Sequence, residues 1–171
     1  MKNIFFVLLL AAAVFAGCKK SDDNPVAAAP PSDVIVGTWV SSGTNVAPLL
    51  VALSKYTKLT ATFNADGTYK IVTIDSAGTQ GTATGTYVTA AGGAASPKDS
   101  IRTIVATQMT PTALTAEGIY QVTPGTPATM KYEVVQTQPS ISAIKPTPAL
   151  GFGSTNAGAL GTWNVQKYVK Q

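Results

Sequence analysis

The chain has 171 residues and a formal net charge of +4, from 12 basic and 8 acidic side chains, with one cysteine and no histidine. Without histidine, Ser-His-Asp and Cys-His catalytic arrangements and histidine-based zinc sites are impossible. The basic residues form no run, whereas nucleic-acid binding needs clustered lysines and arginines. We therefore expect no catalytic activity, no cofactor, no bound metal and no nucleic-acid partner.

The first 17 residues have the features of an export signal. A basic start is followed by an apolar stretch at residues 4–15 and then by two small residues before Cys18. This stretch is shorter than the ~20 residues that a membrane-spanning helix needs. The segment resembles the bacterial lipobox, although Phe15 stands where that family usually has leucine. The resemblance implies that residues 1–17 are a cleaved lipoprotein signal peptide and that acyl chains on Cys18 hold the protein at a membrane.

Residues 18–33 are predicted to form a flexible, acylated tether. Ser21, Asp22 and Asp23 resemble the acidic export signal that sends some Gram-negative lipoproteins to the outer face of the outer membrane. A solvated, charged start to a linker is the alternative explanation. Pro30-Pro31 favours an extended spacer. The expected location is the cell envelope, at the outer membrane, with surface exposure if the acidic signal operates.

Residues 34–171 suffice for one domain with a hydrophobic core, and no internal disulfide is available to stabilise it. Short alternating runs rich in Thr, Val and Ala are separated by turn residues, which is typical of an antiparallel all-β protein. The predicted strands are Val34–Val40, Lys58–Phe63, Thr68–Asp75, Thr82–Thr89, Ser100–Gln108, Ala113–Thr123, Ala128–Thr137 and Thr162–Val169.

One short helix is predicted between the first two strands. Asn45 is a suitable N-cap, Pro48 falls in the first turn, and apolar residues recur at helical spacing from Leu49 to Tyr56. The apolar side of this helix should cover one end of the sheet.

The order of these elements resembles the lipocalin-like small β-barrels. A first strand with Gly37-Thr38-Trp39, a short helix, a meander of hairpins and a final strand carry the resemblance. It implies an eight-stranded antiparallel meander barrel with Trp39 at its closed end, and Trp163 of the second Gly-Thr-Trp near it. Lys167 or Lys170 would replace the arginine that crosses over the tryptophan in that family. A β-sandwich with both tryptophans in its core is the alternative fold.

The alternation of apolar and polar residues along the strands predicts a sheet with one apolar face and one solvent-exposed face. The predicted inward residues are Leu59, Ala61, Phe63, Tyr69, Ile71, Ala83, Gly85, Tyr87, Ile101, Val105, Met130, Tyr132, Val134, Trp163 and Val165; Arg102, Lys131, Glu133, Asn164 and Gln166 are among those assigned to water. The small inward residues either let strands approach closely or leave space for a ligand. The candidate ligand-binding residues are Trp39, Leu53, Phe63, Tyr69, Tyr87, Tyr132, Phe152 and Trp163.

Residues 138–160 contain too many prolines and glycines for regular structure. Such long loops are usually lids, binding surfaces or disordered segments. Because this one carries Ile141, Ile144, Leu150 and Phe152, we expect it to pack over the barrel mouth or against the helix, as a lid or as a structural flap.

Two functions follow from these features. The first is a lipid-anchored, non-enzymatic barrel that binds a small hydrophobic molecule. The alternative is a structural or interaction lipoprotein of a surface glycan-handling or adhesive complex, with a filled core. Glu117 and Glu133 have the residue type of a glycosidase pair, but adjacent strands often bring two carboxylates together by chance.

Overall fold

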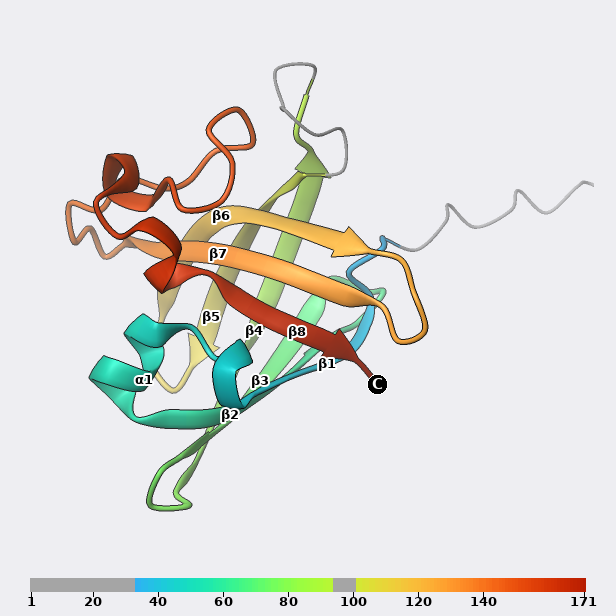
Figure 1. The fold of residues 1–171 in the computed structure, drawn as a ribbon, viewed down its shortest axis with the longest axis vertical. Coiled ribbons are helices and arrows are strands. Elements are labelled where there is room, and N and C mark those ends of the chain that lie inside the picture. Colours follow the sequence, from blue (N-terminus) through green and yellow to red (C-terminus); the bar gives the residue numbers. More distant parts are fainter. Residues whose placement is uncertain (1–32, 94–100) are drawn as a thin grey trace, which may run out of the picture. The chain divides into compact units, whose positions relative to one another are not determined.

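The chain from residue 33 to residue 93 and from 101 to 171 forms a closed antiparallel β-barrel in the computed structural model (Figure 1). Each strand pairs with the next, and the first pairs with the last. The predicted meander barrel is therefore confirmed and the sandwich is wrong. The predicted signal peptide, Cys18, the acidic tripeptide and all but the last residue of the predicted tether lie outside the described residues.

The strands found in the described residues lie close to their predicted positions, and the helix lies between the first two. The elements are β1 (Gly37–Ser42), η1 (Gly43–Asn45), α1 (Pro48–Ser54), β2 (Tyr56–Phe63), β3 (Thr68–Asp75), β4 (Gln80–Ala91), β5 (Arg102–Thr110), β6 (Leu114–Thr123), β7 (Thr129–Gln138), η2 (Thr155–Gly158), η3 (Gly161–Asn164) and β8 (Gln166–Lys170). The N-cap of α1 is Ala47 rather than Asn45, because Asn45 belongs to the short 3₁₀ turn η1. Pro48 is the first helical residue, where its missing amide proton costs nothing.

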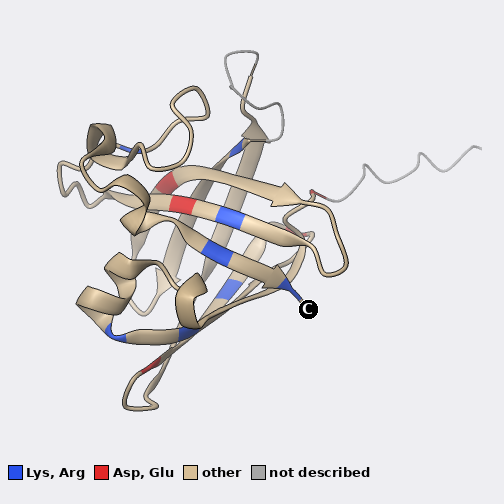
Figure 2. Cartoon of the chain, viewed as in Figure 1, with Lys and Arg blue, Asp and Glu red and all other residues tan. Residues whose placement is uncertain are grey.

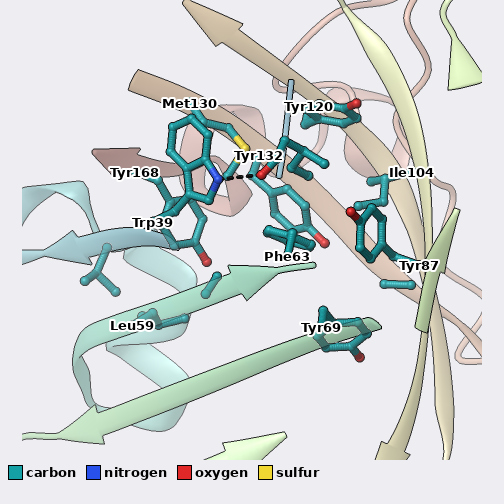
Figure 3. Close-up of a cluster of buried hydrophobic side chains, with 14 residues drawn as sticks. Trp39, Leu59, Phe63, Tyr69, Tyr87, Ile104, Tyr120, Met130, Tyr132 and Tyr168 are labelled. Carbon is teal, nitrogen blue, oxygen red and sulfur yellow. Dashed lines mark hydrogen bonds between the residues drawn. The ribbon is translucent and has the colours of Figure 1, made fainter. Parts of the chain in front are cut away.

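Trp39 is buried in the barrel core (Figure 3), toward the N-terminal end of β1, whereas α1 follows the C-terminal end of that strand. Its indole Nε1–H donates a 2.6 Å hydrogen bond to the carbonyl of Ile35, in the segment that precedes β1. Lys170, paired with Trp39 across β1 and β8, places its Nζ 5.2 Å from the centre of the indole ring. Of the two lysines considered for this position, Lys170 is therefore the one that lies over the ring.

A polar network at the same end ties the segment before β1 to the barrel wall. The Asp33 carboxylate accepts hydrogen bonds from the Tyr120 hydroxyl (2.6 Å) and the Arg102 guanidinium (2.8 Å). It also accepts from the Thr89 hydroxyl and the Ile35 amide. Partial burial raises the pKa of Asp33, but these hydrogen bonds and the charge of Arg102 outweigh burial and lower it overall. Asp33 is therefore held ionised as the centre of the network.

The phase of β5 was predicted wrongly. Ile104 and Ala106 are buried, whereas Val105 is exposed. Ile101 is buried but lies just before the strand. If every second residue after Ile101 is taken to face the core, the predicted inward residues of β5 are wrong by one position. Apolar residues occur at both parities in this segment, which is why the pattern could not fix the phase.

The loop that follows β7, residues 139–160, is here called the flap. It covers part of the outer wall, because Glu133 on β7 receives three hydrogen bonds from it. Glu133 is predicted to face solvent, but it is completely buried. Ile119, which is paired with Glu133 across β6 and β7, points to the same side of the sheet and is also completely buried. The turn η3, which follows the flap, packs against α1.

Figure 2 shows by colour where the charged residues lie along β6, β7 and β8. Glu117 on β6 pairs with Lys145 of the flap, and Lys131 and Lys167 are opposite each other on β7 and β8. Glu117 and Glu133 alternate with the residues that face the barrel interior, so neither points into it. This orientation gives no support to a sugar site between them.

Trp163 does not lie on the final strand. It belongs to η3 and is 58% exposed, because β8 begins only at Gln166. Trp39 pairs with Lys170, at the far end of β8, so the expected proximity of the two tryptophans is also wrong.

Candidate functional site

A cavity of about 190 Å³ lies inside the barrel at the end next to α1. Its lining comes from α1 and its N-cap, from alternate residues of β2, β3, β5, β6, β7 and β8, and from η3. The lining residues are Ala47, Leu50, Leu59, Phe63, Tyr69, Ile71, Ala106, Gln108, Leu114, Ala116, Tyr132, Val134, Asn164, Gln166 and Tyr168. The surface is predominantly apolar, and none of these side chains carries a charge.

The space depends on small side chains at positions that the sequence interpretation did not choose. Ala106 and Ala116, which are paired across β5 and β6, face the cavity. Gly85 has a different role from these alanines, because it allows two strands to approach closely. A Cβ atom there would lie 2.0 Å from the carbonyl oxygen of Thr107 on β5, next to an irregularity in the register. Gly85 therefore lets β4 and β5 approach closely and does not line the cavity.

Three tyrosines, Tyr69, Tyr132 and Tyr168, line the cavity. None of their hydroxyls forms a hydrogen bond with a described residue, in contrast to Tyr87, whose hydroxyl donates to the carbonyl of Asn64 at 2.8 Å. Burial raises the pKa of all three cavity tyrosines above the ordinary value. The hydroxyls are therefore protonated at neutral pH and can donate to a bound molecule.

Two amide side chains lie at the junction of the cavity with α1 and the flap. Gln166 accepts a 2.7 Å hydrogen bond at Oε1 from the amide of Ala47, while its Nε2 has no partner among the described residues. Asn164 donates from Nδ2 to the carbonyl of Val134 (2.9 Å) and to the hydroxyl of Thr155 (3.3 Å). Because Thr155 also binds Glu133, the cavity wall is connected to the flap.

The structure brings together three of the candidate ligand-binding residues, Phe63, Tyr69 and Tyr132. Trp39 and Tyr87 are buried in the same core but do not line the cavity; the Tyr87 ring packs edge-on against Phe63 at 5.1 Å.

The other three candidates lie elsewhere. Leu53 is 75% exposed on α1, Trp163 is exposed on η3, and the Phe152 ring lies 5.8 Å from Nζ of Lys131 on the outer wall. Their role in binding stays a prediction, without support from proximity to this cavity.

Sequence reasoning missed the polar residues of the cavity, Gln108, Asn164 and Gln166. Asn164 and Gln166 are predicted to face solvent because the alternation places Trp163 and Val165, on the opposite face of the predicted strand, inside the barrel. The phase is set by Tyr168, and counting back two residues from this buried tyrosine would have placed Gln166 inside.

No family model, curated protein or solved structure matches the chain. In the described part of the chain, no helix has the length and apolar character needed to span a membrane. Those same residues contain no group of three or more His, Cys, Asp or Glu side chains that could hold a metal ion. The fold and the site thus define an eight-stranded antiparallel barrel with an uncharged internal cavity.

Proposed function

We propose that the protein is a lipid-anchored cell-envelope protein whose barrel binds a small apolar molecule without catalysing a reaction. The cavity is the observation that carries this proposal. Its volume of about 190 Å³ exceeds the roughly 150 Å³ of an engineered cavity that takes up benzene, and is below the roughly 300–1,000 Å³ of drug-sized sites. A single ring or a short branched chain suits this volume.

The wider architecture supports a lipocalin-like barrel as part of the proposal. Trp39 is buried on the first strand, and Lys170 lies over its ring where that family has arginine. The segment before β1 is tied down beside Trp39, whereas the cavity lies at the opposite end, beside α1. A ligand would therefore enter next to α1.

Protein purified from its native host in a mild detergent is expected to carry a small apolar compound. Native mass spectrometry should show a mass beyond that of the acylated chain, which is lost when the sample is denatured. Ala116→Phe should abolish this extra mass, because the ring fills the cavity, while circular dichroism still shows a β-protein. If no adduct is present and calorimetry detects no binding of ethylbenzene, the proposal is wrong.

That negative result would favour the alternative function, a structural or interaction lipoprotein of a surface glycan-handling or adhesive complex. One observation points in this direction. The flap exposes Ile141, Ile144 and Leu150, which are apolar side chains suited to contact with another protein.

The anchor and the location belong to the same proposal. Acyl chains on Cys18 would hold the protein at the outer membrane, and Ser21, Asp22 and Asp23 would direct it to the outer face. Cys18→Ala is expected to move the protein from the detergent phase to the aqueous phase in a detergent-partition assay. Ser21→Ala serves as the control, since it leaves the acylated residue in place. Unchanged partitioning of the Cys18 variant would contradict acylation.

A further inference from the structure

Gln166 lines the cavity and has a buried side-chain donor without a partner among the described residues. The residue is 3% exposed and lines the cavity. Its Oε1 accepts from the amide of Ala47 at 2.7 Å. Because a backbone N–H can only donate, the atom facing it must be the oxygen, and the orientation of the side-chain amide is therefore fixed. Nε2 then has two protons to donate and no acceptor among the described residues.

Buried polar groups in folded proteins almost always have a hydrogen-bond partner, since an unpaired buried donor is unfavourable. We propose that the molecule bound in the cavity is a neutral compound with a ring-sized apolar body and a carbonyl oxygen that accepts a hydrogen bond from Nε2 of Gln166. This inference rests on the proposed function and adds the chemical class of the ligand.

The lining distinguishes a carbonyl compound from a carboxylate. Among the described residues no lysine or arginine lines the cavity, so a buried carboxylate would have no charge to compensate its loss of hydration. Tyr69, Tyr132 and Tyr168, by contrast, line the same cavity and carry neutral hydroxyl donors. A carbonyl oxygen can accept from Nε2 without introducing a charge, and its apolar body contacts Leu59, Ile71 and Val134.

Two probes of similar shape test the proposal. Acetophenone has the carbonyl oxygen, whereas ethylbenzene has only the apolar body. Their dissociation constants are measured by calorimetry in the wild type and in Gln166→Met, and the ratio between them is compared. The variant is expected to weaken acetophenone binding about tenfold relative to ethylbenzene, because it removes the donor but keeps the side-chain volume.

Gln108→Met is the matched control. Gln108 also lines the cavity, but its Nε2 already donates to the carbonyl of Thr112 at 2.7 Å. This variant should leave the ratio of the two dissociation constants within about threefold of the wild-type ratio. If Gln166→Met does not fold, Gln166→Leu replaces it, since leucine also lacks the donor and fits the same space.

The outcomes separate the two levels of the proposal. If both probes bind and their ratio is the same in the wild type and the Gln166 variant, the carbonyl assignment is wrong and the binding function stands. If benzoate binds more tightly than acetophenone, the neutral class is wrong. If no probe binds, the proposed function and this inference are both overturned.

Discussion

Replacing Trp39 by alanine is expected to lower the free energy of unfolding by about 3–5 kcal/mol, the usual cost of removing a fully buried large aromatic side chain. The indole is 0% exposed, and its Nε1–H satisfies the carbonyl of Ile35 at 2.6 Å. The substitution would leave a void beneath Lys170, whose Nζ lies over the ring, and would release the segment before β1. The loss should appear in urea unfolding followed by far-UV circular dichroism, which does not depend on tryptophan emission.

Trp163→Ala is the matched control, because Trp163 stands in the same tripeptide, Gly-Thr-Trp. It is 58% exposed, so its replacement should change the free energy of unfolding by no more than about 1 kcal/mol. Trp39→Phe should lie between wild type and Trp39→Ala, since it keeps most of the apolar volume but loses the hydrogen bond. Equal losses for Trp39→Ala and Trp163→Ala would contradict the packing described here.

These two tripeptides also show where sequence patterns stop being informative. Gly37-Thr38-Trp39 is followed by a run that pairs with β2 along its length, and it is a strand. Gly161-Thr162-Trp163 has the same letters but forms a 3₁₀ turn that packs against α1. Local propensity is the same in both, and tertiary contacts decide between strand and turn.

The barrel itself could be predicted because its strands alternate and its hairpins are short. The turn from Asn64 to Gly67 is an example: Asp66 Oδ1 accepts from the Thr68 amide at 2.9 Å, and Gly67 has a φ of 81°. Such local chemistry fixes where a hairpin reverses. The closing pair, β1 with β8, followed from the lipocalin-like order of elements rather than from any local signal.

The candidate site was predictable only where apolar residues alternate cleanly. Phe63, Tyr69 and Tyr132 were found because their strands have one apolar face. Gln166 was missed because a polar residue facing a cavity looks, in sequence, like one facing water. Its burial depends on Ala47, 119 positions away in the chain, which no local pattern records.

Glu133→Ala is expected to lower the free energy of unfolding by about 3 kcal/mol, because it leaves several buried donors without an acceptor. Its carboxylate accepts from the amide of Gly153 at 2.6 Å and from the amide and hydroxyl of Thr155 at 3.1 and 2.5 Å. These bonds hold the flap on the outer wall. Amide hydrogen exchange at Gly153 and Thr155 should therefore accelerate more than exchange within β2 and β3.

The control for this variant is Glu117→Ala, on the adjacent strand and the same outer wall. Glu117 pairs with Lys145 of the flap, but both side chains remain partly exposed, so removing it should cost roughly 0–1 kcal/mol. A similar loss in both variants would mean that the flap is held by charge rather than by buried hydrogen bonds. If exchange at Gly153 and Thr155 did not change in Glu133→Ala, the flap would be held by other contacts. Because Asn164 links Thr155 to the cavity wall, a released flap is also expected to weaken the binding of ethylbenzene.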